Sequence, residues 1–85
     1  MLNERVSAAK KIASDLHRAE DAIDEAMIRI AQLAATLPTA RRDTNMSAIV
    51  GQAAMSKVAN ALAAAGEVRQ LLTDAHLALT VTQKE

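Results

Sequence analysis

Three side chains in the first half of the chain have the types and spacing of a metal site. His17, Glu20 and Asp24 are three and four positions apart, so in a helix they share one face. Helical bundles that hold two metal ions use a Glu-x-x-His motif from two helices and carboxylates from the others. Here the order is reversed, and the expected second helix offers no carboxylate opposite. A metal-binding bundle that uses His17, Glu20 and Asp24 is therefore an alternative hypothesis only.

Glu20 alone is also a candidate general base. No nucleophile or oxyanion donor accompanies it, so we expect no catalytic residue, no cofactor and no enzyme activity. His76 is expected to lie too far along the chain to join the same site within one subunit. Near the end of a second helix, its expected role is a favourable interaction with the helix dipole.

The composition excludes several kinds of partner. Ten basic and ten acidic residues give zero net charge, and the chain has no aromatic residue to stack on a base. Arg41 and Arg42 stand together at an expected turn, where they suit a phosphate or an acidic partner, but two arginines are not a basic stripe. We therefore expect no nucleic-acid partner.

Targeting and membrane signals are missing from the same sequence. The N-terminal stretch has no apolar signal region, and charges interrupt every apolar run before the roughly 20 residues that span a bilayer. Cysteine is absent, so neither disulfides nor thiolate metal ligands are available. We expect a cytoplasmic protein without membrane contact.

The elements that must position these residues are helices. The chain is alanine-rich, with 20 alanines, and strong helix formers dominate the rest. Pro38 disfavours helical geometry at Leu37, which predicts a first helix over about residues 2–37. A strict seven-residue repeat runs through it at Leu2, Val6, Ala9, Ala13, Leu16, Glu20, Ile23, Met27, Ile30, Ala34 and Leu37.

The second half repeats the pattern after a connection over about residues 38–45. Asp43, Thr44 and Asn45 are each good N-caps for a second helix over about residues 46–82. Its expected repeat is Ser47, Gly51, Ala54, Val58, Ala61, Ala65, Val68, Leu72, Ala75, Leu79 and Thr82. This segment has few charges, which is typical of a helix covered on more than one side.

Two helices of similar length joined by a short connection predict an antiparallel hairpin in a single domain, residues 1–85. A turn near residues 41 and 42 brings opposite charges together across the hairpin. The expected pairs are Glu25 with Lys57, Asp15 with Arg69, and Lys10 with Asp74.

One hairpin cannot bury two wide apolar stripes, so we expect a homodimer that closes into a coiled-coil-like four-helix bundle. Glu20, the polar member of the first repeat, is a means of specifying register and oligomeric state. The expected interface consists of Leu16, Glu20, Ile23, Met27, Ile30, Val58, Ala61, Ala64, Ala65, Val68 and Leu72.

The pattern favours a non-enzymatic module for self-association or for binding another protein. A second hypothesis is a small helical-hairpin component of a secretion or phage-type assembly. The third is the metal-binding bundle described above.

Overall fold

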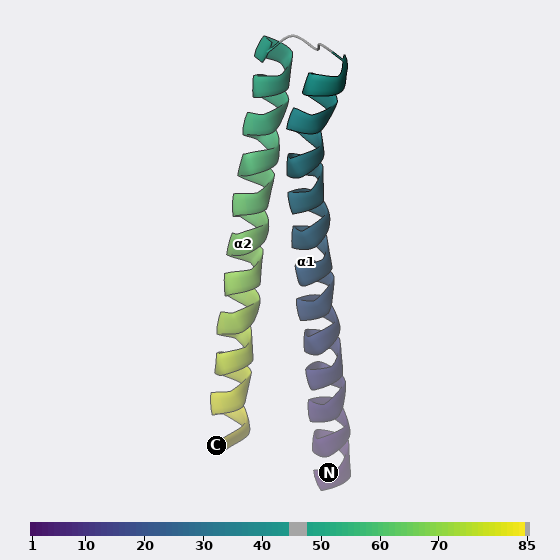
Figure 1. Cartoon of the computed structure of the whole chain (residues 1–85). Helices are drawn as coiled ribbons and strands as arrows, with labels where there is room; N and C mark the ends of the chain where they lie inside the picture. The colour runs from purple at the N-terminus through teal and green to yellow at the C-terminus, as the bar shows by residue number, and fades with distance from the viewer. Residues whose placement is uncertain (45–47, 85) are drawn as a thin grey trace.

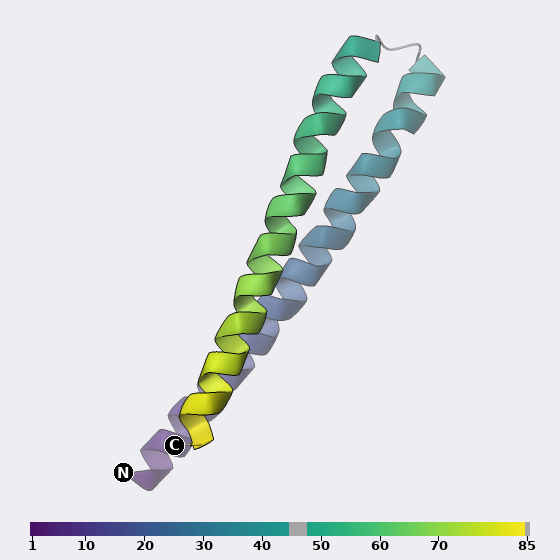
Figure 2. The ribbon, with the colours of Figure 1, turned by 90° about the vertical axis from the view of Figure 1, so that its left-hand side faces the viewer.

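The periodic apolar residues in both halves of the chain lie in helices. The computed structural model describes residues 1–44 and 48–84, and in these residues it contains two helices and no strand. Helix α1 spans Leu2–Thr44 and helix α2 spans Ala48–Lys84. Both views show α2 beside α1, running in the opposite direction (Figure 1 and Figure 2). The predicted all-α hairpin is confirmed.

The predicted end of the first helix near residue 37 is wrong, because α1 continues through Pro38 to Thr44. A proline inside a helix removes one backbone hydrogen bond and costs about 3 kcal/mol. We attribute the continuation of the helix to contacts between its last turns and α2. Arg41 is half-buried against α2, where its Cδ lies 3.0 Å from the position that a Cβ on Gly51 would take.

The longer first helix also excludes two of the three expected capping residues of the second helix. Asp43 and Thr44 are the last residues of α1, so neither caps α2. The Thr44 hydroxyl instead donates to the backbone oxygen of Ala40, at 2.7 Å. Asn45 and the expected helix start at residue 46 lie outside the described residues.

The longer first helix also changes the pairing of the two helices. Arg69 contacts Asp24 and Glu20 rather than Asp15, while Asp15 pairs with Lys11 of its own helix. Because α1 continues past residues 41 and 42 to Thr44, each residue of α1 faces a later residue of α2 than expected. The predicted pairs Glu25 with Lys57, Asp15 with Arg69, and Lys10 with Asp74 are therefore wrong.

The row of α2 that faces α1 includes a different set of residues from the predicted repeat. Met55 and Leu62 are half-buried, whereas Ala61 and Val68 are exposed. The larger apolar side chains bury more surface against α1 than alanines would, which favours this rotation of the helix. The contact row runs through Gly51, Met55, Val58, Leu62, Ala65, Arg69, Leu72, His76 and Leu79.

The hairpin is a thin rod with little buried interior. Its principal extents are 65 × 16 × 11 Å, and its radius of gyration of 19.4 Å exceeds the roughly 12 Å of a compact chain of this length. Among residues 1–44 and 51–80, whose burial is described, only Ala65 is buried, at 7% exposed. Neither described helix has an apolar stretch that could cross a membrane.

Candidate functional site

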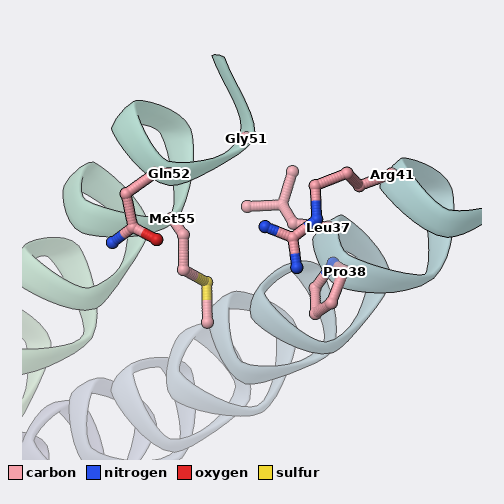
Figure 3. A pocket seen from close by; sticks show the side chains of 6 residues that line it. All are labelled: Leu37, Pro38, Arg41, Gly51, Gln52 and Met55. Carbon is pink, nitrogen blue, oxygen red and sulfur yellow. The ribbon is translucent and has the colours of Figure 1, made fainter. Parts of the chain in front are cut away.

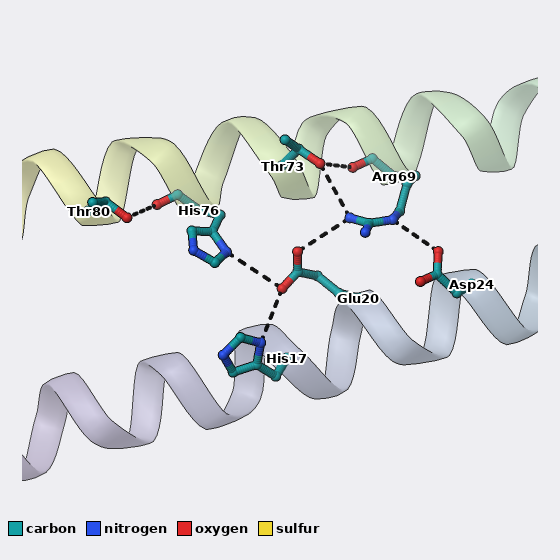
Figure 4. A network of polar contacts seen from close by, with 7 residues as sticks. All are labelled: His17, Glu20, Asp24, Arg69, Thr73, His76 and Thr80. Carbon is teal, nitrogen blue, oxygen red and sulfur yellow. Dashed lines mark hydrogen bonds and ion pairs between the residues drawn. The ribbon is translucent and has the colours of Figure 1, made fainter.

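Glu20 lies at the centre of a polar cluster in the seam between the two helices (Figure 4). The seven-residue repeat of α1 directs this side chain at α2, and its exposed fraction is only 16%. A carboxylate in this position loses water and therefore needs charged or hydrogen-bonding partners. It obtains them from both helices.

Arg69 of α2 is the main partner. Its Nη1 donates to Glu20 Oε2 at 3.3 Å, and its Nε donates to Asp24 Oδ1 at 3.0 Å. Thr73 supports the guanidinium from one turn further along α2, because its hydroxyl accepts from Nη1 at 3.3 Å. The rigid guanidinium thus joins two carboxylates that are one turn apart on α1.

Two histidines face the other oxygen of the same carboxylate. The Nδ1 atoms of His17 and His76 lie 3.5 and 3.7 Å from Glu20 Oε1, and each pair is ionic only when the imidazole is protonated. The two rings approach edge to face, with centroids 6.1 Å apart. The expectation that His76 is too far away to join this site is wrong, because the shifted pairing brings it opposite Glu20.

The cluster unites the predicted candidates His17, Glu20 and Asp24, but not as metal ligands. Within residues 1–44 and 48–84, no group of three or more His, Cys, Asp or Glu side chains is arranged to hold a metal ion. Arg69 occupies the space between the Glu20 and Asp24 carboxylates, where its positive charge opposes a cation (Figure 4). The arrangement suits an ion-pair network rather than metal chemistry.

This cluster also connects the helices. In the described part of the chain, every side-chain hydrogen bond or ion pair that joins α1 to α2 comes from it. Arg69 meets both carboxylates in this register, and a register shift along the helices would separate them. Small alanine side chains interlock less than large ones and therefore specify register weakly. A polar group in an apolar seam is the best-attested device for specifying register.

The two long sides of the hairpin differ in character. On one side the seam is bordered by polar members of the cluster, including His17, Asp24 and Thr73. Ala19 and Val68 immediately precede Glu20 and Arg69 in the chain. In an antiparallel helix pair, these two positions border the opposite side of the seam. We call this surface the apolar side; it consists of Ile12, Ala19, Ala22, Ala26 and Leu33 of α1 with Ala54, Ala61, Ala64, Val68, Leu71 and Ala75 of α2.

Large side chains stand exposed on the apolar side. Leu71 is 67% exposed and Leu33 is 49% exposed, with Ile12 and Val68 at 46% each. Leu77 is also 61% exposed, but it lies away from this surface, on the side of the polar cluster. An exposed apolar row of this kind is a candidate surface for binding another molecule.

The predicted interface residues divide between the seam and this surface. Ala61, Ala64 and Val68 are exposed on the apolar side. The others line the seam within one chain, where they are half-buried or, for Ala65, buried: Leu16, Glu20, Ile23, Met27, Ile30, Val58, Ala65 and Leu72.

Sequence reasoning missed Arg69 and His76 as members of the polar cluster. The signal that identifies them is the row of large side chains at Met55 and Leu62, because the same repeat continues to both residues. The predicted repeat instead includes Ala54, Ala61, Val68 and Ala75, each one residue before a member of this row. It therefore contains neither Arg69 nor His76.

A shallow groove of about 160 Å³ lies near the turn, between Leu37, Pro38 and Arg41 of α1 and Gly51, Gln52 and Met55 of α2. Figure 3 shows the Arg41 side chain reaching from α1 across this groove. The groove is far smaller than the roughly 300–1,000 Å³ of a typical ligand pocket.

Comparison with known proteins gives no relative. No family model matches the chain, and no curated protein or solved structure shows significant similarity to it.

Proposed function

We propose that this protein is a non-enzymatic helical interaction module that self-associates through the apolar side of its hairpin. Two hairpins that cover this side for one another form a four-helix bundle. The proposal rests on the large apolar surface that one hairpin leaves in water.

The accessible surface is the observation that carries the proposal. The chain exposes 6664 Å², whereas a compact monomer of 9.0 kDa exposes roughly 4,900 Å². A stable complex buries about 800 Å² on each partner. The hairpin can therefore lose an interface of ordinary size and still be more exposed than a compact protein.

The chemistry of the apolar side supports a helical partner. Its centre on α2 consists of small alanines around Val68 and Leu71, which allow another helix backbone to approach closely. Because the chain lacks aromatic residues, these aliphatic side chains are the largest apolar anchors on the surface.

The polar cluster supports a non-enzymatic role. Glu20 is engaged by Arg69, and the cluster contains no cysteine or lysine nucleophile beside a base. The Thr73 hydroxyl is occupied as well, since it donates to the Arg69 backbone oxygen at 3.1 Å. In this proposal, the polar cluster stabilises the hairpin, and the apolar side binds the second copy of the chain.

Two leucines of the same helix provide a matched test. Leu71→Gln places an amide on the apolar side, while Leu77→Gln makes the same change at a similarly exposed position away from it. Burying a leucine contributes about 1.5–3 kcal/mol, and a symmetric dimer contains the change twice. Leu71→Gln should raise the dissociation constant at least about tenfold, and Leu77→Gln should leave it unchanged.

Analytical ultracentrifugation over a range of concentrations measures these constants. We expect the unmodified chain to sediment at twice its 9.0 kDa mass at micromolar concentration. A monomer at all concentrations up to about 1 mM would refute self-association. Masses that grow beyond the dimer without a plateau would instead favour a component of a secretion or phage-type assembly.

A further inference from the structure

The apolar side has a near-symmetric order of residues along α1. Ala22 stands at the centre, with Ala19 and Ala26 on either side. Further out, Ile12 and Leu33 lie at nearly equal separations from Ala22. Asp15 and Arg29, which border the apolar side, lie seven residues before and seven residues after Ala22. Each apolar residue thus has an apolar counterpart, and the acidic residue has a basic counterpart.

The same centre occurs on α2. Val68 and Leu71 flank a midpoint close to residue 70, and Ala64 and Ala75 lie symmetrically beyond them. Arg41 lies against Gly51 in the hairpin, and this pairing places Ala22 level with residue 70. The two helices therefore share one centre of symmetry on this surface.

We infer that a second copy of the chain docks antiparallel on the apolar side, about a two-fold axis beside Ala22 and between Val68 and Leu71. This inference rests on the proposed self-association and names its geometry. Residues at equal distances from the axis meet across the interface. Ile12 of one copy lies beside Leu33 of the other, and Val68 lies beside Leu71 of the other.

Charge determines the direction of docking. In the antiparallel arrangement, Asp15 of each copy lies beside Arg29 of the other, which makes two attractive pairs. A parallel arrangement that brings the two α1 helices together places Asp15 near Asp15 and Arg29 near Arg29, which makes two repulsive pairs. The other parallel arrangement packs α1 on α2 of the second copy and makes no pair between Asp15 and Arg29. The Asp15 and Arg29 side chains are 56% and 72% exposed, so both are accessible to a partner while they pair with Lys11 and Glu25 of their own helix.

Charge reversal tests these contacts. Asp15→Arg and Arg29→Asp should each weaken the homodimer about tenfold, because each change replaces two attractive pairs with two repulsive ones. An equimolar mixture of the two variants should form a heterodimer as tight as the unmodified dimer. Measurement of the dissociation constants by ultracentrifugation distinguishes these outcomes, and the mixture controls for the lost pairs with Lys11 and Glu25. Equal affinities for the two homodimers and the mixture would overturn the inference.

Engineered cysteines test the direction independently, since the chain has no cysteine of its own. In the antiparallel dimer, two copies of Ile12→Cys hold their thiols about 30 Å apart and cannot form a disulfide. A mixture of Ile12→Cys and Leu33→Cys chains should cross-link under mild oxidation, whereas neither chain should cross-link alone.

Ala22→Cys, next to the axis, separates the failure of this inference from the failure of the proposed function. Cross-linking of Ala22→Cys together with self-linking of Ile12→Cys would leave self-association intact and overturn the antiparallel geometry. A dimeric sample whose mixed Ile12→Cys and Leu33→Cys chains fail to cross-link would overturn the geometry as well. A monomeric mass without cross-linking at any position would refute both proposals.

Discussion

At the scale of single residues, the Glu20 carboxylate is the group around which the polar contacts between the two helices are arranged. Its partners come from both helices, and Arg69 links it to Asp24. These bonds add less stability than their number suggests, because Arg69 is 35% exposed and water screens the charges. Their main contribution is to specify the register of the two helices, which the alanine-rich apolar contacts specify only weakly.

Removal of the Glu20 carboxylate should therefore have a modest but measurable cost. We expect Glu20→Ala to lower the free energy of unfolding by about 1 kcal/mol, since Arg69 loses its less exposed partner. Urea denaturation at fixed protein concentration measures the change. Lys11→Ala is the control, because it removes an exposed pair within α1 and should alter stability by less than about 0.5 kcal/mol. Equal effects of the two variants would contradict a special role for Glu20.

At the scale of elements, α1 shows tertiary packing prevailing over a local helix breaker. Pro38 lies inside the helix, and the turn beyond it contacts α2 through Arg41. This extension moves the connection along the chain and so determines which residues of α2 face the Glu20 cluster. The placement of His76 in the cluster is a direct consequence.

Replacement of Pro38 tests the continuity of α1. We expect Pro38→Ala to raise the free energy of unfolding by about 1–3 kcal/mol, because it restores a backbone hydrogen bond and removes a steric clash. Gly66→Ala calibrates the gain from helix propensity alone, at about 1 kcal/mol, since its new Cβ would meet nothing within 4 Å. A loss of stability in Pro38→Ala would indicate that the chain needs a break at this position.

At the scale of the whole molecule, the hairpin has little buried interior. Ala65 is the only buried residue among those whose burial is described, and small single cores are marginal without cross-links or partners. In the proposed dimer, association on the apolar side supplies further burial. Folding and dimer formation are then expected to be coupled.

Coupling makes the melting temperature depend on protein concentration. A tenfold increase in concentration adds about 1.4 kcal/mol per dimer, which should raise the melting temperature by roughly 3–5 °C. Circular dichroism at several concentrations measures this shift. The slope should shrink in Leu71→Gln and persist in Leu77→Gln, and a melting temperature independent of concentration would argue for a stable single hairpin.

The sequence by itself determined the class of structure. Seven-residue spacing of apolar side chains and the abundance of alanine predict two long helices, because helix formation depends on local propensity and on one continuous apolar face. The grouping of His17, Glu20 and Asp24 on one face follows from the same spacing. Each of these inferences concerns residues within one or two helical turns of each other.

Tertiary structure alone decided the end of α1, the register and the row of α2 that faces α1. Ala61 and Leu62 lie on either side of the row formed by Val58, Ala65 and Leu72, and both are apolar, so the local pattern does not choose between them. The choice depends on the surface buried by Met55 and Leu62 and on the bonds from Arg69 to Glu20 and Asp24. These contacts join residues far apart in the chain, and their free energy appears only when both helices are in place.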